Sequence, residues 1–260
     1  MIIRALEKTT KAIIFNPLTL LPMLIAVIIA KVSTNLTSFI FERPISEMLL
    51  YYETVMSSDF ISIFLARYPI EILVMFLSIF IVLLVIVLGL VSLVNYAKGK
   101  SIVDSINDSF INFKKAFFLT FFGIIILFLS LISFVIIQSI FNFIYNIFPA
   151  DINNILSLFI LPLIMFIIFV IYLTKLSFVL PASQDNNIRE AIKSSWEFTD
   201  NKFVNAFAYL LIVMIIIGIL TIIITNMGIF LELNFIFEAI ADIIGMTFFG
   251  LSISYYYFNK

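Results

Sequence analysis

The chain has 260 residues, of which 63% are apolar and 31 are Phe, and its formal net charge is -1. So much apolar surface exceeds what the core of a water-soluble protein buries, which indicates that lipid surrounds most of it. The chain has no Cys and no His. It therefore lacks disulfides, thiolate nucleophiles and the main side-chain ligand of zinc and haem sites.

Six apolar runs each approach the roughly 20 residues that a helix needs to cross about 30 Å of hydrocarbon. They are apolar at consecutive positions rather than at every second one, which predicts helices and not a membrane β-barrel. The predicted spans cover residues 13–30, 72–94, 117–137, 155–175, 207–225 and 235–257. We therefore expect an all-α integral membrane protein with about six transmembrane helices in a single membrane domain, residues 1–260.

The positive charges are distributed unevenly along the chain. All but three of the 15 Lys and Arg residues precede the first span, lie between the second and third or the fourth and fifth spans, or lie at the inner ends of the spans. By the positive-inside rule, this pattern predicts a multi-pass protein of the cell membrane with both termini in the cytoplasm. The other three, Lys31, Arg43 and Arg67, fall in an expected outer loop of residues 31–69.

Two segments with helical amphipathicity follow even-numbered spans, at residues 101–114 and 187–200. A shift of 86 residues aligns them and also aligns the spans that follow. Residues 2–12 precede the first span and are a candidate third, more diverged copy. The sequence thus predicts repeated units, each with one amphipathic surface helix and a two-span hairpin. Such a helix either braces its hairpin in the headgroup layer or offers a groove to a partner.

The first turns of two of these surface helices carry matching start signals. Ser101 precedes Asp104 by three residues, and Asn187 precedes Glu190 by three residues. Each pair has the spacing of a capping box, in which the first side chain accepts a hydrogen bond from a backbone N–H in the first turn. We therefore expect helices that begin just after Ser101 and Asn187.

The sixth span contains two acidic residues, Glu238 and Asp242, which are four residues apart and share a helix face. Ionisable groups in hydrocarbon require a compensating partner or a cavity. One interpretation is that Asp242 binds a cation or proton, with Glu238 at the outer mouth of the site. The other is that Asp242 is neutral or accepts hydrogen bonds from a neighbouring span. Ala241 and Gly245 form a small-xxx-small pair that would let another helix approach closely.

Two residues near the inner interface are further candidates. Lys175 lies at the inner end of the fourth span, where it either snorkels to water or contacts a lipid phosphate. Trp196 lies at the centre of an amphipathic face, which suits an interfacial anchor. We find no nucleotide-binding, metal-ligand or nucleophile motif, so we expect no catalytic residue and no cofactor. Acidic residues balance the inner Lys residues, which argues against nucleic-acid binding.

Residues 180–207 read LPASQDNNIREAIKSSWEFTDNKFVNAF. The segment contains, in this order, a Pro that ends a span, an Ala-Ile-x-x-Ser-Trp helix and the start of an aromatic-rich span. The residues in these positions are Pro181, Ala191, Ile192, Ser195, Trp196 and Phe203. The segment resembles prokaryotic multi-span proteins related to the membrane domain associated with glycerophosphodiester phosphodiesterases. The resemblance implies a six-span architecture and a link to membrane or lipid biology, but no enzymatic activity, because the phosphodiesterase chemistry belongs to a separate soluble domain.

Two functions remain open at this point. The first is a non-catalytic polytopic membrane protein that binds lipid or serves as a scaffold or accessory component in membrane homeostasis. The second is a transporter or channel subunit that uses an intramembrane carboxylate for cation or proton coupling. The expected partners are membrane lipids, together with other membrane proteins or a second copy of the chain.

Overall fold

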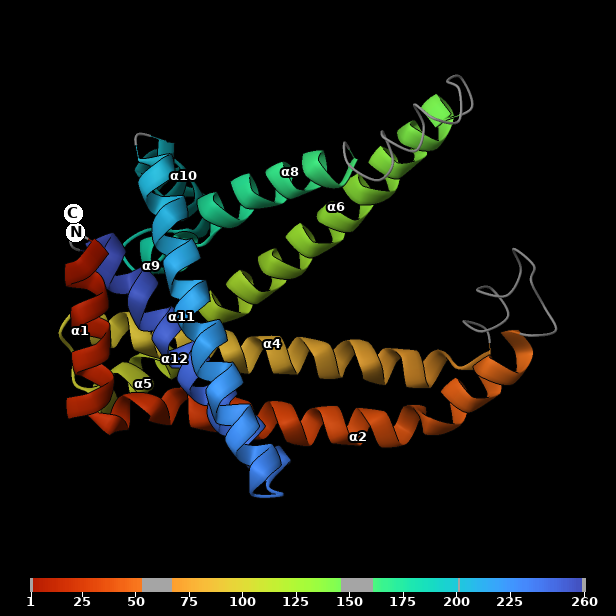
Figure 1. The fold of residues 1–260 in the computed structure, drawn as a ribbon, viewed down its shortest axis with the longest axis horizontal. Coiled ribbons are helices and arrows are strands. Elements are labelled where there is room, and N and C mark those ends of the chain that lie inside the picture. The colour runs from red at the N-terminus through yellow and green to blue at the C-terminus, as the bar shows by residue number, and fades with distance from the viewer. Residues whose placement is uncertain (1, 53–66, 146–160, 201, 259–260) are drawn as a thin grey trace.

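The computed structural model describes residues 2–52, 67–145, 161–200 and 202–258, which form helices joined by turns (Figure 1). Their elements in chain order are α1 (Ile2–Phe15), the 3-10 helix η1 (Pro17–Leu20), α2 (Leu21–Tyr52), α4 (Pro69–Ala97), α5 (Ile102–Ile111), α6 (Phe113–Tyr145), α8 (Leu161–Leu176), α9 (Val179–Ala182), α10 (Ile188–Asp200), α11 (Phe203–Phe230) and α12 (Asn234–Phe258). The predicted all-α class is confirmed.

Four helices are long and apolar enough to cross a membrane, namely Pro17–Ile40, Pro69–Ala97, Phe203–Phe230 and Asn234–Phe258. A fifth candidate is the pair Ile102–Ile111 and Phe113–Ile126, whose axes bend by 73° at the break between them. The chain is therefore a multi-span helical membrane protein with four or five candidate spans among its described residues. The start of the predicted span at 155–175 lies outside those residues, and its described part belongs to α8.

The first span differs from its predicted bounds at both ends. It begins later, because Asn16 leaves the helical conformation (φ -134°, ψ 77°) before Pro17, as residues that precede a proline tend to do. It ends later, because α2 continues to Tyr52 through much of the expected outer loop. Hydroxyls in this stretch bond carbonyls four residues back, from Thr34 to Ala30 and from Ser38 to Thr34. These polar side chains are thereby satisfied within the helix itself.

The two N-caps predicted from the sequence are confirmed. Ser101 Oγ accepts a hydrogen bond from the backbone N–H of Asp104 at 3.2 Å, and also donates to the Asp104 carboxylate at 2.6 Å. Asn187 Oδ1 accepts one from the backbone N–H of Glu190 at 3.0 Å. The surface helices α5 and α10 therefore begin where the spacing of these residues predicts.

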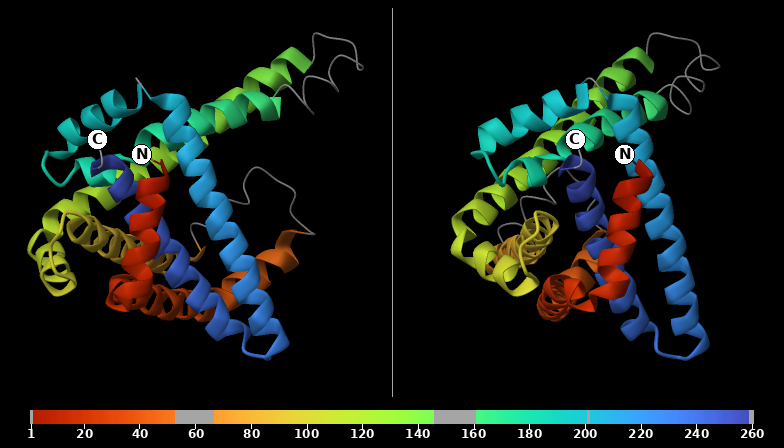
Figure 2. Two further views of the ribbon diagram at one scale, coloured as in Figure 1. Left: turned by 60° about the vertical axis from the view of Figure 1, so that its left-hand side comes forward. Right: turned by 90° about the vertical axis from the view of Figure 1, so that its left-hand side faces the viewer.

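Most of the buried core lies at one end of the molecule. Helices α1, α9 and α10 gather there with the last turns of α12 and both chain termini (Figures 1 and 2). We call this region the terminal end. Its core is aromatic at the centre, where the Tyr209 and Tyr256 rings stack at 4.1 Å and Phe178 packs against Tyr256 and Phe198. Away from the terminal end, the hairpins expose large apolar side chains, as membrane spans do.

Each surface helix buries two small residues four positions apart, and these are Ala5 and Thr9 in α1, Ser105 and Ser109 in α5, and Ala191 and Ser195 in α10. One hydroxyl group of each pair forms a hydrogen bond with a residue of a neighbouring helix. Ser252 donates to Thr9 at 3.3 Å, Ser92 donates to Ser109 at 2.8 Å, and Ser195 donates to the carbonyl of Lys175. As a result α1 docks on α12, α5 on α4 and α10 on the end of α8.

Candidate functional site

The two acidic residues of α12 meet a lysine from α2. Lys31 Nζ lies 3.7 Å from Asp242 Oδ2 and 3.8 Å from Glu238 Oε2. It also lies 5.3 Å from the centre of the Phe235 ring. We call Lys31, Glu238 and Asp242 the Lys31 cluster. Its formal charge is negative, because two carboxylates share one ammonium group.

The Lys31 cluster lies within the length of two candidate spans. Asp242 is eight residues from the start of α12 at Asn234, which corresponds to about 12 Å along the axis. Its side chain is nevertheless 46% exposed, and those of Glu238 and Lys31 are 56% and 29% exposed. The separations of the charged atoms exceed ordinary hydrogen-bond lengths. The cluster is thus an ionic contact with open sides at a depth where charge is costly.

Sequence reasoning found Glu238 and Asp242 but not their partner. The predicted span ended at Ala30, so Lys31 was assigned to the outer loop. The structure instead places Lys31 inside the span Pro17–Ile40. The run of hydroxyls after Lys31 was the available signal, since Ser and Thr can continue a helix by bonding the preceding turn.

Hydroxyl groups join α2 to α4 beside the Lys31 cluster. Ser33 Oγ and Ser78 Oγ lie 2.5 Å apart, and Thr37 Oγ1 donates to Ser78 Oγ at 2.6 Å. Ser78 is buried, with 8% of its surface exposed. Since hydroxyl bonds between spans hold membrane helices together, these three residues fix α2 against α4. No sequence motif marked them.

The small residues of α12 pack within this chain. Ala241 is buried, and a Cβ placed on Gly245 would lie 3.2 Å from Ile217 Cγ2 of α11. This contact is tight, so Gly245 allows α11 to approach α12 closely, as the small-xxx-small spacing suggested. Gly245 therefore serves the packing of the α11–α12 hairpin.

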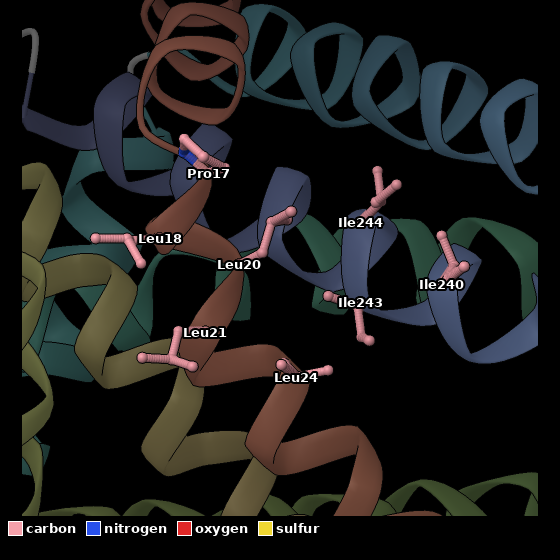
Figure 3. A pocket seen from close by; sticks show the side chains of 8 residues that line it. All are labelled: Pro17, Leu18, Leu20, Leu21, Leu24, Ile240, Ile243 and Ile244. Carbon is pink, nitrogen blue, oxygen red and sulfur yellow. The ribbon is translucent and has the colours of Figure 1, made fainter. Parts of the chain in front are cut away.

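An apolar groove of about 360 Å³ lies between the start of the first span and α12 (Figure 3). One wall comes from η1 and α2, and the other comes from the N-terminal half of α12. The lining residues are Pro17, Leu18, Leu20, Leu21, Leu24, Ile240, Ile243 and Ile244. All eight are apolar, and one end of the groove is Pro17, next to the break that Asn16 makes in the helix between α1 and α2. Such a surface offers contacts to a hydrocarbon chain and none to a polar solute.

The groove and the Lys31 cluster lie on different faces of α12. Asp242 is two residues from both Ile240 and Ile244, and two residues correspond to a rotation of about 200° around a helix. Asp242 is not among the residues that line the groove. The two features are therefore separate candidates and can be tested separately.

The structure brings together the two candidates of the terminal end, Lys175 and Trp196. Lys175 Nζ lies 4.1 Å from the centre of the Trp196 ring and 2.6 Å from Asp200 Oδ1. Only 14% of the Lys175 side chain is exposed. The ammonium group thus has both an anion and an aromatic face as partners. Trp196 is 36% exposed at the rim of the core, where an amphipathic ring fits an interface.

The described residues contain no group of three or more acidic side chains close enough together to hold a metal ion. Among the candidate site residues, the available chemistry is ion pairing, hydrogen bonding and apolar contact. Comparison with known proteins gave no match to a family model, to a curated protein or to a solved structure.

Proposed function

We propose that this chain is a non-catalytic polytopic membrane protein that binds lipid and acts as a scaffold or accessory component in membrane homeostasis. The observation that carries the proposal is the apolar groove between Pro17–Leu24 and Ile240–Ile244. Its inner end lies at the break between a surface helix and a span. A bound lipid would have the boundary between its headgroup and its acyl chain at this level. An acyl chain laid in the groove would cover apolar side chains of both walls that the packing of α2 on α12 leaves open.

Native mass spectrometry of the protein released from nanodiscs tests this proposal without a guess at the lipid. Wild type should retain lipid well above its bulk share. Leu24→Trp should fill the groove and reduce the retained lipid severalfold. Ile222→Trp is the matched control, because Ile222 is 61% exposed on α11 and lies outside the groove. Equal lipid retention in all three proteins would refute the groove as a lipid site.

The second candidate function is that of a transporter or channel subunit, and the Lys31 cluster supports it. Two carboxylates share one cation within a span, and all three side chains remain partly exposed. Intramembrane ionisable groups are functional candidates by default. Asp242→Asn should then abolish ion or proton flux in proteoliposomes while leaving expression intact. If wild-type protein gives no flux above empty liposomes across monovalent cation and proton gradients, this candidate fails.

We also propose that the chain consists of three repeated units with six spans and has both termini in the cytoplasm. The docking pattern supports the repeat, because each surface helix binds the last helix of the preceding unit, and α1 binds the last helix of the third unit. Three units arranged in a closed ring would produce this pattern. The charge asymmetry supports the orientation. The resemblance of residues 180–207 to the phosphodiesterase-associated membrane domains fits the same architecture.

Cysteine accessibility tests this topology, since the chain has no native Cys. Single Cys residues at Ser101 and Asn187 should react with a membrane-impermeant maleimide only after the membrane is opened. A Cys at Glu232, in the turn between α11 and α12, should react in intact cells. Labelling of all three positions in intact cells would overturn the proposed orientation.

A further inference from the structure

Three segments far apart in the sequence converge at the terminal end. Lys98 follows α4, Lys115 lies in the first turn of α6, and Gln184 and Asp185 form the turn between α9 and α10. Lys98 Nζ donates to Asp185 Oδ1 at 2.5 Å, and Lys115 Nζ donates to the Gln184 carbonyl at 3.2 Å. Two ammonium groups from different hairpins therefore meet at two consecutive residues of one turn.

One polar atom at this junction lacks a partner among the described residues. Gln184 Nε2 is a buried hydrogen-bond donor that makes no hydrogen bond to any described residue. Buried donors are nearly always satisfied, so an unsatisfied donor calls for an acceptor from outside the chain. Each ammonium group also has three donors, more than its single acceptor here uses. The junction thus has an excess of donors.

The net charge of this junction also favours an anionic ligand. The sum of the formal charges is +1 for Lys98, Lys115 and Asp185. The Asp185 side chain is 69% exposed, whereas that of Lys98 is 25% exposed. The Phe258 ring covers another side of Lys98, at 5.2 Å from Nζ. Asp185 is the more exposed partner of the pair, and an incoming anion would compete with it for Lys98. A ligand with several acceptor oxygens and negative charge would satisfy all three donor groups.

We propose that Lys98, Lys115 and Gln184 bind a phosphate group, carried either by a lipid headgroup or by a free phosphate. The junction lies next to the starts of the surface helices α5 and α10, which the proposed topology puts in the cytoplasmic headgroup layer, where lipid phosphates are found. Its residues are distinct from those of the apolar groove and of the Lys175 contact. The inference consequently stands whether or not the groove binds an acyl chain.

Two probes on full-length protein test the site and identify the source of the phosphate. The first is inorganic phosphate, titrated calorimetrically into detergent-solubilised protein against chloride of equal ionic strength. The second is phosphatidic acid in nanodiscs, compared with diacylglycerol, with retained lipid measured by native mass spectrometry. Binding of inorganic phosphate would indicate a soluble ligand. Retention of phosphatidic acid over diacylglycerol without binding of inorganic phosphate would indicate a lipid headgroup.

Two variants with opposite expected effects make the test sharp. Lys115→Gln should weaken binding of the active probe about tenfold, the loss expected for one charged hydrogen bond. Asp185→Asn should strengthen binding, because it removes the anion that competes for Lys98. Lys11→Gln is the charge-matched control, since Lys11 is 62% exposed on α1 and pairs only locally with Glu7.

If Lys115→Gln does not fold, the Asp185→Asn variant carries the test, because its side chain is exposed and its substitution does not open the core. No binding of either probe by wild type would overturn the proposal. Equal binding by wild type, Lys115→Gln and Asp185→Asn would overturn it as well, since these lysines would then play no part.

Discussion

Two lysines of this protein, Lys31 and Lys175, meet acidic partners in different ways. Lys175 lies 2.6 Å from one carboxylate, is covered by an aromatic ring and is 14% exposed. Lys31 lies 3.7 and 3.8 Å from two carboxylates and is 29% exposed. The first contact is short and charge-balanced and covers its ammonium group, whereas the second is long, carries excess negative charge and leaves its ammonium group more exposed.

The difference indicates what each contact can do. A short pair of balanced charge leaves no net charge for another ligand to neutralise, so the Lys175 contact holds α8 to α10. In the Lys31 cluster, one ammonium group does not neutralise two carboxylates. The remaining negative charge is costly within a span, because hydrocarbon does not solvate a carboxylate. The Lys31 cluster is therefore the contact at which we expect the loss of a charge to cost the most stability.

The largest effect is expected from Lys31→Met, because it leaves two carboxylates without the cation that both contact. We expect the free energy of unfolding to fall by about 3 kcal/mol, the scale of an uncompensated charge within a span. Detergent-denaturant titration followed by circular dichroism measures it. Adding Asp242→Asn should recover part of the loss. If Lys31→Met unfolds like wild type, water already solvates the carboxylates and the comparison with Lys175 fails.

A smaller effect is expected from Lys175→Met, because Asp200 is 53% exposed and water can solvate it once the lysine is gone. The loss should be about 1 kcal/mol, the sum expected for a partly exposed ion pair and a cation–π contact. Lys193→Met is the control, since Lys193 is 76% exposed and pairs with Glu197 at 3.7 Å. The same titration should give no measurable change for it. A loss at Lys175 as large as at Lys31 would contradict the distinction between a balanced contact and one with excess negative charge.

The local features of both regions were predictable from the sequence. Helix class, most of the spans and the N-caps at Ser101 and Asn187 depend on periodicity and on residues a few positions apart. Trp196 and Lys175 were identified singly, because an amphipathic ring and a lysine at a span end each indicate an interface. Their contact was not predicted, since it depends on how α10 turns back onto α8.

The ionic partner of Asp242 could not be predicted from the sequence. Lys31 is far from Asp242 in the sequence, and pairing between distant spans leaves no periodic signal. The bounds of the first span also hid it, because the predicted span ended at Ala30, one residue before Lys31. Only the packing of α2 across α12, around Met23, Val27, Ile243 and Leu251, brings the lysine to the acidic pair.

The smallest effect is expected from Trp196→Phe, which keeps an aromatic face over Lys175 but weakens its attraction for the ammonium group. We expect a loss of about 0.5 kcal/mol, because indole is the strongest cation–π partner and phenyl a weaker one. Circular dichroism must report unfolding here, since Trp196 is the only Trp in the chain. In the Lys175→Met background the same change should have less effect, because no cation remains above the ring. Equal effects in both backgrounds would mean that Trp196 acts by packing alone, and the Lys175 contact would then reduce to its ion pair with Asp200.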